Sequence, residues 1–244
     1  MDELGELIGQ SKLVFKRADR PEELDEIFRL RYQVYCNESH FLRPEDYPEG
    51  KESDKFDRHS IFFTASDQYG MIGAVRLVLD SPNGFPFEDH CRGKLNIDMK
   101  DFPRKEAVEV SRLVISKRYR RRAADGLRYA PDFDDSVTGS DLENMTKRVR
   151  PMAFGLYREM YHESKRRGIT HWFALMEKPL SFLLRMHGFT FKPIGDEVDL
   201  YGMVAPYLAC VEEVERSVYQ KSPKFTKDYF MQGLERRYLP KFVI

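Results

Sequence analysis

Cysteine is scarce in this sequence. Only three of the 244 residues are cysteines, and they lie far apart, at Cys36, Cys91 and Cys210. No CxxC pair occurs, which argues against a disulfide framework or a zinc knuckle and favours a reducing compartment. None of the three has a His or Asp partner at a recognisable spacing, so a cysteine nucleophile is not expected.

Long apolar runs are also missing. No stretch of about 20 apolar residues exists, which excludes a conventional membrane-spanning helix. The first residues, MDELG, are acidic and no apolar stretch follows them, so a signal peptide is not expected. The expected location is therefore the cytoplasm.

The chain has no excess of charge of either sign. Its 40 Lys and Arg residues balance 40 Asp and Glu residues, so the formal net charge is zero. A general nucleic-acid coat protein would carry a net basic charge, which disfavours that class without excluding local patches. With 33% charged and 41% hydrophobic residues, the composition is that of a charge-rich globular protein, long enough to bury a core without disulfides or metal.

Apolar periodicity and turn residues predict a mixed order of strands and helices. Strands are expected at 13–16, 61–65, 71–79, 106–116, 171–176, 189–192 and 199–204. Helices are expected at 21–36, 141–167, 179–187 and 206–239, the second bent or restarted at Pro151 and the last divided by Pro223. Loops are expected at 37–57 and 80–103, and an irregular excursion at 117–140. This order predicts a mixed α/β fold with a central antiparallel stretch and one βαβ unit.

Three short patterns of charged and aromatic residues follow one another along this layout. They are FRLRYQVY (28–35) continuing to Phe41, DKFDRH (54–59) followed by GAVRL (73–77), and EVSR (109–112). Together they resemble the autoinducer-synthase branch of the GNAT-fold acyltransferases. In that branch an arginine and aromatics on the first helix, an Asp-x-x-Asp, a Gly-x-x-Arg-Leu and a Glu-x-x-Arg recur in this order.

The segments RYQVYCNESHFL and DRHS are more similar still to the PEP-CTERM/exosortase system-associated acyltransferases. These are relatives of the long-chain N-acyl amino acid synthases. The resemblance covers roughly residues 13–205. It implies a GNAT fold, with a mixed and mostly antiparallel sheet flanked by helices. The domain would occupy residues 1–205, and a helical extension over 206–244 would pack on it.

The resemblance implies transfer of a long-chain fatty acyl group from acyl-carrier protein, or less favourably from acyl-CoA, to the amine of an amino acid or a similar small molecule. No permanently bound cofactor and no metal are expected. Two alternatives stay open: an acetyl-CoA-dependent amine or protein acetyltransferase, and a non-catalytic acyl-binding module. The sequence does not decide whether residues 206–244 cap the site, touch a membrane surface or form an interface.

Glu109 lies in a strand otherwise rich in Val, Ile and Leu, where loss of water would raise its pKa and make it a better base. The resemblance makes it a candidate base, acting directly or through water; the alternative is an ion pair with Arg112 or Arg76. Residues i and i+3 of a strand face opposite sides unless a bulge intervenes. A bulge would also expose backbone N–H groups near Ser111–Val114 to a thioester oxygen. The catalytic candidates are Glu109, Ser111 and Arg112.

Several further charges lie near apolar strands. The resemblance places them in an ion-pair cluster that shapes the amine pocket and could hold a substrate carboxylate; ordinary surface pairing is the alternative. The cluster consists of Arg31, Asp54, Asp57, Arg76 and Arg112.

Tyr35 and Phe41 occupy positions where the family has aromatic residues, so they are expected to form a wall of the substrate pocket or to pack in the core. His59 is a second candidate base, although a histidine at a strand start is more often structural. A stripe along the long helix, which includes Met152, Leu156 and Met160, either packs in the core or encloses the acyl chain.

A basic run begins at residue 117. It comprises Lys117, Arg118, Arg120, Arg121 and Arg122. GNAT enzymes place a glycine-rich, pyrophosphate-binding loop here, and its glycine pattern is largely missing. A bare basic patch suits the acidic surface and phosphopantetheine arm of an acyl-carrier protein, with Lys147, Arg148 and Arg150 as additions. A solvated basic loop is the alternative, and nucleic-acid binding is disfavoured because no aromatic residues are interleaved in the manner that binding requires.

Overall fold

The computed structural model describes residues 13–100, 102–117 and 139–243, and within 139–151 it describes the course of the backbone only. Among these residues no helix has both the length and the apolar character needed to cross a membrane.

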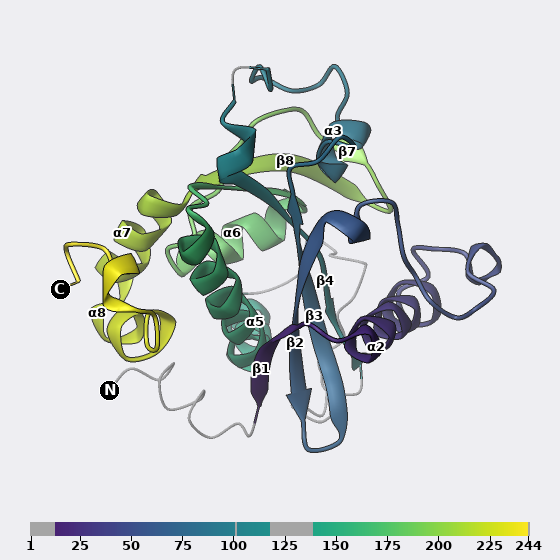
Figure 1. Cartoon of the computed structure of the whole chain (residues 1–244), viewed down its shortest axis with the longest axis horizontal. Helices are drawn as coiled ribbons and strands as arrows, with labels where there is room; N and C mark the ends of the chain where they lie inside the picture. The colour runs from purple at the N-terminus through teal and green to yellow at the C-terminus, as the bar shows by residue number, and fades with distance from the viewer. Residues whose placement is uncertain (1–12, 101, 118–138, 244) are drawn as a thin grey trace.

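One mixed β-sheet forms the centre of the molecule (Figure 1). Its spatial order is β1-β2-β3-β4-β5-β8-β6, and β7 pairs with β8. The strands are β1 (Val14–Ala18), β2 (Ser60–Asp67), β3 (Gly70–Leu79), β4 (Ala107–Ile115), β5 (His171–Met176), β6 (Lys192–Pro193), β7 (Val198–Asp199) and β8 (Met203–Cys210). All neighbouring pairs are antiparallel except β4 and β5, which are parallel.

Helices and short helical turns connect these strands. The longer ones are α2 (Pro21–Tyr32), which continues as the π-helix η1 (Gln33–Glu38), α5 (Gly139–Arg167), α6 (Lys178–Met186) and α7 (Val211–Lys221). The short ones are η2 (Pro44–Asp46), η3 (Asp57–His59), α3 (Pro86–His90), η4 (Arg104–Glu106), α8 (Pro223–Phe225), η5 (Thr226–Phe230) and η6 (Arg236–Tyr238).

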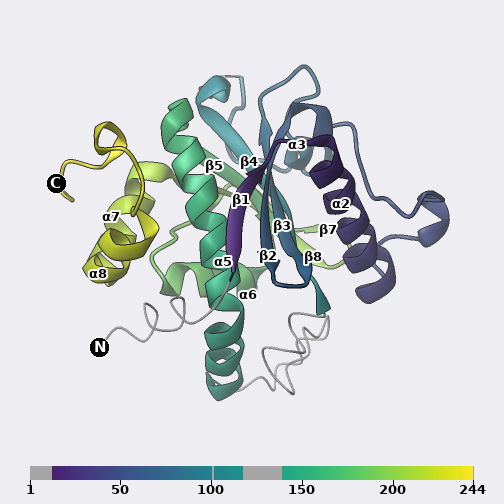
Figure 2. The same cartoon turned by 60° about the horizontal axis from the view of Figure 1, so that its bottom comes forward.

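The sheet lies between two helical layers. Figures 1 and 2 show α2 on one side of β1–β3 and α5 on the other, with α7 and α8 beside α5. Ile27 and Leu30 of α2 pack on Phe62 of β2 in the smaller core. Met152 and Leu156 of α5 are fully buried in the larger core on the opposite face. The sheet is thus covered on both faces.

Most predicted elements are confirmed. The hairpin of β2 and β3 is present, and β4, α5 and β5 form the expected βαβ unit with parallel strands. Gly168 ends α5 with a φ of 70°, a conformation that glycine adopts without a steric penalty. The first helix is also present, although its last residues form η1 instead of continuing as an α-helix.

Four predictions about the elements are wrong. The strand expected at 189–192 forms only as the two-residue β6, Lys192–Pro193. α5 runs through Pro151 without a restart, because the rest of its face is anchored in the core. The segment 80–103, expected to be a loop, contains α3. The last strand is 203–210 instead of 199–204, since residues 200–202 form a turn with Tyr201 and Gly202 at positive φ.

Pro206 explains the last error, because a proline is typical of a helix start. Here it lies in β8 opposite Leu175 of β5, and its carbonyl oxygen accepts a hydrogen bond from the Ile194 N–H. The final helical region therefore begins at Val211, and the predicted domain boundary between residues 205 and 206 falls inside β8.

Candidate active site

The two parallel strands at the centre of the sheet separate along their length. The pairing of β4 with β5 runs from Ala107–His171 to Val110–Ala174, and the rest of β4 pairs only with β3. Within that second half, Ser111 opposes Arg76 and Val114 opposes Ala74. Two residues of β4 therefore face the single residue between them on β3, which is a β-bulge.

Arg112 is the first residue of this bulge and has a φ of 52°, an uncommon conformation for a side chain other than glycine. The bulge shifts the alternation of β4, so that Glu109 and Arg112 border the same cavity although they are three residues apart. The predicted bulge is thereby confirmed. The edge of Ser111–Leu113 that is not paired with β5 borders this cavity too.

A cavity of about 280 Å³ lies in the gap between β4 and β5. Its walls are mostly apolar and come from β4, β5, α5, α6 and the turn between β7 and β8. The apolar residues that line it include Val110, Leu113, Met160, Ala174, Met176, Leu180, Leu184, Phe189, Phe191 and Val204. Five polar residues from η1, α3 and β4 form its polar end: Tyr35, His90, Glu109, Ser111 and Arg112. Tyr157, Trp172, Glu177 and Tyr201 add polar atoms elsewhere on the wall.

Glu109 is the most deeply buried carboxylate of the cavity wall, with 2% of its surface exposed. Its Oε2 accepts a hydrogen bond from the Phe87 N–H at 2.8 Å. Burial raises the pKa of Glu109 to about 8, and the Phe87 N–H and the charge of Arg76 oppose this only in part. Glu109 makes no ion pair within 4.0 Å among the described residues, so the structural pairing with Arg112 or Arg76 is not formed.

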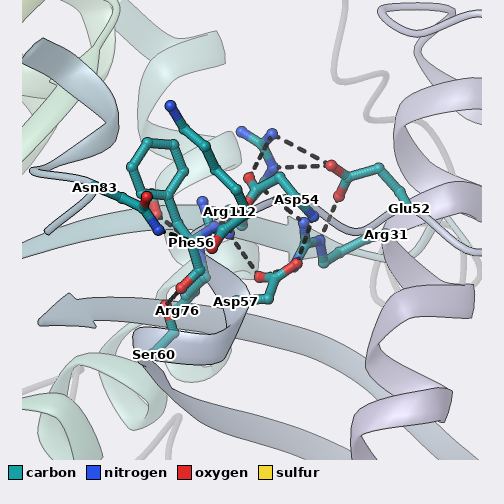
Figure 3. Close-up of polar contacts among 11 residues, drawn as sticks. Arg31, Glu52, Asp54, Phe56, Asp57, Ser60, Arg76, Asn83 and Arg112 are labelled. Atoms are coloured by element: carbon teal, nitrogen blue, oxygen red, sulfur yellow. Dashed lines mark hydrogen bonds and ion pairs between the residues drawn. The ribbon is translucent and has the colours of Figure 1, made fainter. Parts of the chain in front are cut away.

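Next to Glu109 lies a buried network of alternating charges, shown in Figure 3. Arg31 of α2 is completely buried, its Nε donates to Glu52, and its Nη1 donates to Asp57 at 2.7 Å. Arg76 of β3 is equally buried, and its Nη1 donates to Asp54 at 2.7 Å and to Asp57 at 2.6 Å. Asp57 thus accepts from two guanidinium groups.

Arg112 completes this network at the cavity wall. Its Nη2 lies 3.2 Å from both Glu52 Oε1 and Asp54 Oδ2, and 30% of its side chain is exposed (Figure 3). Arg112 is therefore the only arginine of the network that borders the cavity described here. The network holds three arginines and three carboxylates, and it spans α2, the segment before β2, β3 and β4.

The charges stabilise one another against the cost of burial. Burial alone would raise the pKa of Glu52, but Arg112 and Arg31 hold the pKa of that carboxyl below its usual value. For Asp54, burial likewise acts to raise the pKa, and Arg76 and Arg112 keep it lowered. These carboxylates are therefore charged at neutral pH, in contrast to Glu109.

The two aromatic candidates both line the cavity. The Arg112 guanidinium lies over the Tyr35 ring at 5.6 Å, which is within the range of a cation–π contact. The Phe41 ring stacks on Tyr201 of the β7–β8 turn, with the ring centroids 6.2 Å apart. Two segments far apart in the sequence thus meet over one side of the cavity.

Of the remaining predicted catalytic and basic-run residues, the structure describes Ser111 and Lys117 and leaves the others outside the described part of the chain. Ser111 lines the cavity, and its Oγ accepts a hydrogen bond from Arg76 Nε at 3.0 Å. The backbone N–H of Lys117 donates to Glu38 of η1 at 2.9 Å. The other residues of the basic run, Arg118, Arg120, Arg121 and Arg122, lie outside the described residues, as do the side chains of Lys147, Arg148 and Arg150.

Sequence reasoning missed two residues of the site. Glu52 is completely buried at the centre of the network but is one of many acidic residues in a polar segment, so nothing in the pattern distinguishes it. His90 lines the cavity, whereas His59, the histidine singled out by its position after Asp57, does not. No group of three or more potential ligand side chains with metal-binding geometry occurs in the described part of the chain.

Glu109 makes the stability of the fold depend on pH. Because its pKa rises from 4.5 to about 8 on folding, its stabilising contribution is fully present below about pH 4.5 and is lost as the pH rises through about 8. The uncharged Glu109→Gln variant lacks this loss. We therefore compare the melting temperature of the variant minus that of the wild type at two pH values. We expect this difference to be at least ~5 °C larger at about pH 9 than at about pH 5. Circular dichroism melts at both pH values measure it, and a pH-independent difference would contradict the buried, raised-pKa assignment.

Comparison with known proteins agrees with this architecture. Residues 30–129 match the family described as acetyltransferase (GNAT) domain. No curated protein sequence matches the chain significantly.

Solved structures share its fold at low sequence identity. The acyl-homoserine lactone (AHL) synthase LasI has a TM-score of 0.59 and 14% identity, over 86% of this chain and 96% of that one. The CoA-dependent acyl-homoserine lactone synthase BjaI, solved with SAM and isopentyl-CoA, has a TM-score of 0.58 and 16% identity over 86% and 89% of the two chains. FeeM, an N-acyl amino acid synthase from uncultured soil microbes, has a TM-score of 0.52 and 12% identity over 86% and 97%. At these identities the likeness shows the fold, and the chain has the GNAT fold that its sequence predicts.

Proposed function

We propose that this protein is an N-acyltransferase that moves a long-chain fatty acyl group from a thioester to the amine of an amino acid or a similar small molecule. The observation that carries the proposal is the position of Glu109. A buried carboxyl whose pKa is raised to about 8 lies at the polar end of a mostly apolar cavity, beside a buried ionic network. A base whose pKa is close to the working pH is the most effective in proton transfer.

The apolar part of the cavity suits an acyl chain. Leu180 and Leu184 of α6, Met160 of α5 and Met176 of β5 surround it with aliphatic and thioether groups. Methionine side chains adapt to chains of different shape. A pocket with long apolar walls favours a long acyl group over an acetyl group, because burial of each further CH₂ contributes about 0.8 kcal/mol.

The polar end of the cavity suits the acceptor. Tyr35 and Phe41 form one side of it, and Arg112 presents part of its guanidinium there. Glu52 and Asp54 hold Arg112 in place. Arg31, Arg76 and Asp57 complete the network behind these two carboxylates and do not line the cavity, so we assign them to positioning Arg112 at the amine site. A carboxylate on the acceptor would pair with Arg112 and place its amine near Glu109.

The reaction follows from these positions. The acceptor nitrogen attacks the thioester carbon, a C–N bond forms, and the C–S bond breaks to release a thiol. Backbone N–H groups along Ser111–Leu113 would stabilise the negative charge that develops on the carbonyl oxygen. Glu109 takes a proton from the attacking nitrogen and passes it to the departing sulfur.

The donor belongs to the same proposal. The largely absent glycine pattern after residue 117, together with the basic run there, favours an acyl-carrier protein over CoA. BjaI, which has the same fold, was solved with isopentyl-CoA, so acyl-CoA stays the second choice. The motif resemblance to the PEP-CTERM/exosortase system-associated acyltransferases supports a long-chain donor and a small-molecule acceptor, and we place the reaction in the cytoplasm.

Mass spectrometry of lipids from cells that express the protein tests the proposal. We expect a new N-acylated amine in cells with the wild type and none in cells with Glu109→Gln at equal protein level. Accumulation of N-acetylated products instead would favour the acetyl-CoA-dependent alternative. Absence of any new acylated species, with tight binding of acyl-carrier protein retained, would favour the non-catalytic acyl-binding alternative.

A further inference from the structure

His90 is the last residue of α3, the short helix whose backbone binds the carboxylate of Glu109. α3 connects β3 to the segment before β4, and its second residue, Phe87, donates its N–H to Glu109 at 2.8 Å. Pro86 and His90 are four residues apart, and both line the cavity. α3 therefore fixes the carboxyl of Glu109 and presents an imidazole at the wall of the same cavity.

The surroundings of His90 combine solvent access with a nearby positive charge. The residue is exposed, so its ring reaches water at the polar end of the cavity. Partial burial lowers its pKa, and Arg112 of β4 lowers it further. Asp89 on α3 and Asp54 oppose this shift, and Lys55 supports it; Asp89 and Lys55 pair with each other at 2.7 Å. His90 is therefore neutral at neutral pH and able to accept a proton.

The proposed reaction requires two proton transfers. A primary amine enters as an ammonium ion and must lose one proton before its lone pair can attack. The nitrogen loses a second proton when the C–N bond forms, and the thiolate that leaves gains one. One proton therefore leaves the site for solvent and one moves within it. Glu109 is 2% exposed and is suited to the transfer within the site, whereas a base with more solvent access is suited to the transfer that ends in water.

Resting on the proposed function, we propose that His90 is the base that takes the first proton from the acceptor ammonium and releases it to water. Glu109 then takes the second proton from the nitrogen and gives it to the departing sulfur. The balance is complete: ammonium and thioester yield amide and thiol, with one proton delivered to solvent through the imidazole. His90 is thus a catalytic residue in contact with the acceptor.

Two acceptors of different basicity test this role. One is an amino acid, which is an ammonium ion at about pH 7; the other is an acyl hydrazide, whose terminal nitrogen is already neutral at that pH. We expect His90→Gln to lower kcat/KM for the amino acid by about 100-fold and for the hydrazide by less than about 5-fold. Raising the pH toward the pKa of the ammonium should restore much of the lost rate with the amino acid.

His171→Gln is the matched control. His171 at the start of β5 also has a pKa lowered by burial, but it does not line the cavity, so both acceptors should react at wild-type rates. His90 is exposed, and its variant should keep the wild-type melting temperature. An equal loss on both acceptors, or no loss on either, would overturn the role of His90 while leaving the proposed transferase intact. A wild type that acylates neither acceptor would remove the proposed function itself.

Discussion

Replacing Glu109 by Gln lowers the rate of acyl transfer by about 100-fold or more, which is the usual contribution of a general base. Gln keeps the size of the side chain and can still accept a hydrogen bond from the Phe87 N–H, so the cavity wall is retained. The loss should appear in kcat, because the base acts in the transition state. The wild-type rate should rise with pH through about 8, as Glu109 ionises, and the variant should lack this rise.

Glu213→Gln is the control for this experiment. Glu213 lies on α7, is exposed and pairs with Lys192, so the same chemical change there should leave the rate unaltered. Thiol release measured with purified protein gives the rates. Wild-type turnover by Glu109→Gln would contradict the assignment of Glu109 as the base.

Replacing Arg31 by Met destabilises the fold by about 3–5 kcal/mol, because Glu52 and Asp57 each lose one of their two arginine partners and stay in the interior with less compensation. Arg31 is completely buried and bonds to Glu52, which is also completely buried, and to Asp57. Met has a similar length and no charge, so the change removes the ionic contact more than the packing. Urea denaturation at neutral pH measures the difference in the free energy of unfolding.

Arg29→Met on the same helix separates the buried ion pairs from helix propensity. Arg29 is exposed and pairs with Asp25 at 2.8 Å four residues away, which contributes less than about 1 kcal/mol. If the two variants lose equal stability, the network does not act as a buried unit. If Arg31→Met lowers the free energy of unfolding only as much as Arg29→Met does, Glu52 and Asp57 reach water or bind protons once Arg31 is gone.

The strands that carry the candidate site could be predicted from the sequence because their signals are local. The short apolar runs of β2 and β3, and the apolar surroundings of Glu109 in β4, are properties of consecutive residues, so a local pattern detects them. The order of Arg31, the Asp54–Asp57 pair and Arg76 also has a pattern. Their gathering into one network, however, depends on the pairing of β3 with β4 and on the packing of α2.

Other features depend on contacts that no short pattern encodes. Glu52 enters the network because the segment before β2 folds back over α2, where the Glu52 N–H donates to the Phe28 carbonyl oxygen. α3 forms in a proline- and glycine-containing stretch because Phe85 and Phe87 pack against Phe173 of β5. Pro206 was misleading for the opposite reason, since its strand conformation is imposed by pairing with β5.

The most direct test of the account is the fate of an acyl thioester mixed with the purified protein and a set of amino acids. We predict that mass spectrometry finds an N-acyl amino acid formed in equal amount to the thiol released, from a long-chain acyl-carrier protein donor. Release of free fatty acid without an amide, or no consumption of the thioester with either acyl-carrier protein or acyl-CoA, would contradict the claim that the cavity between β4 and β5 transfers an acyl group to an amine.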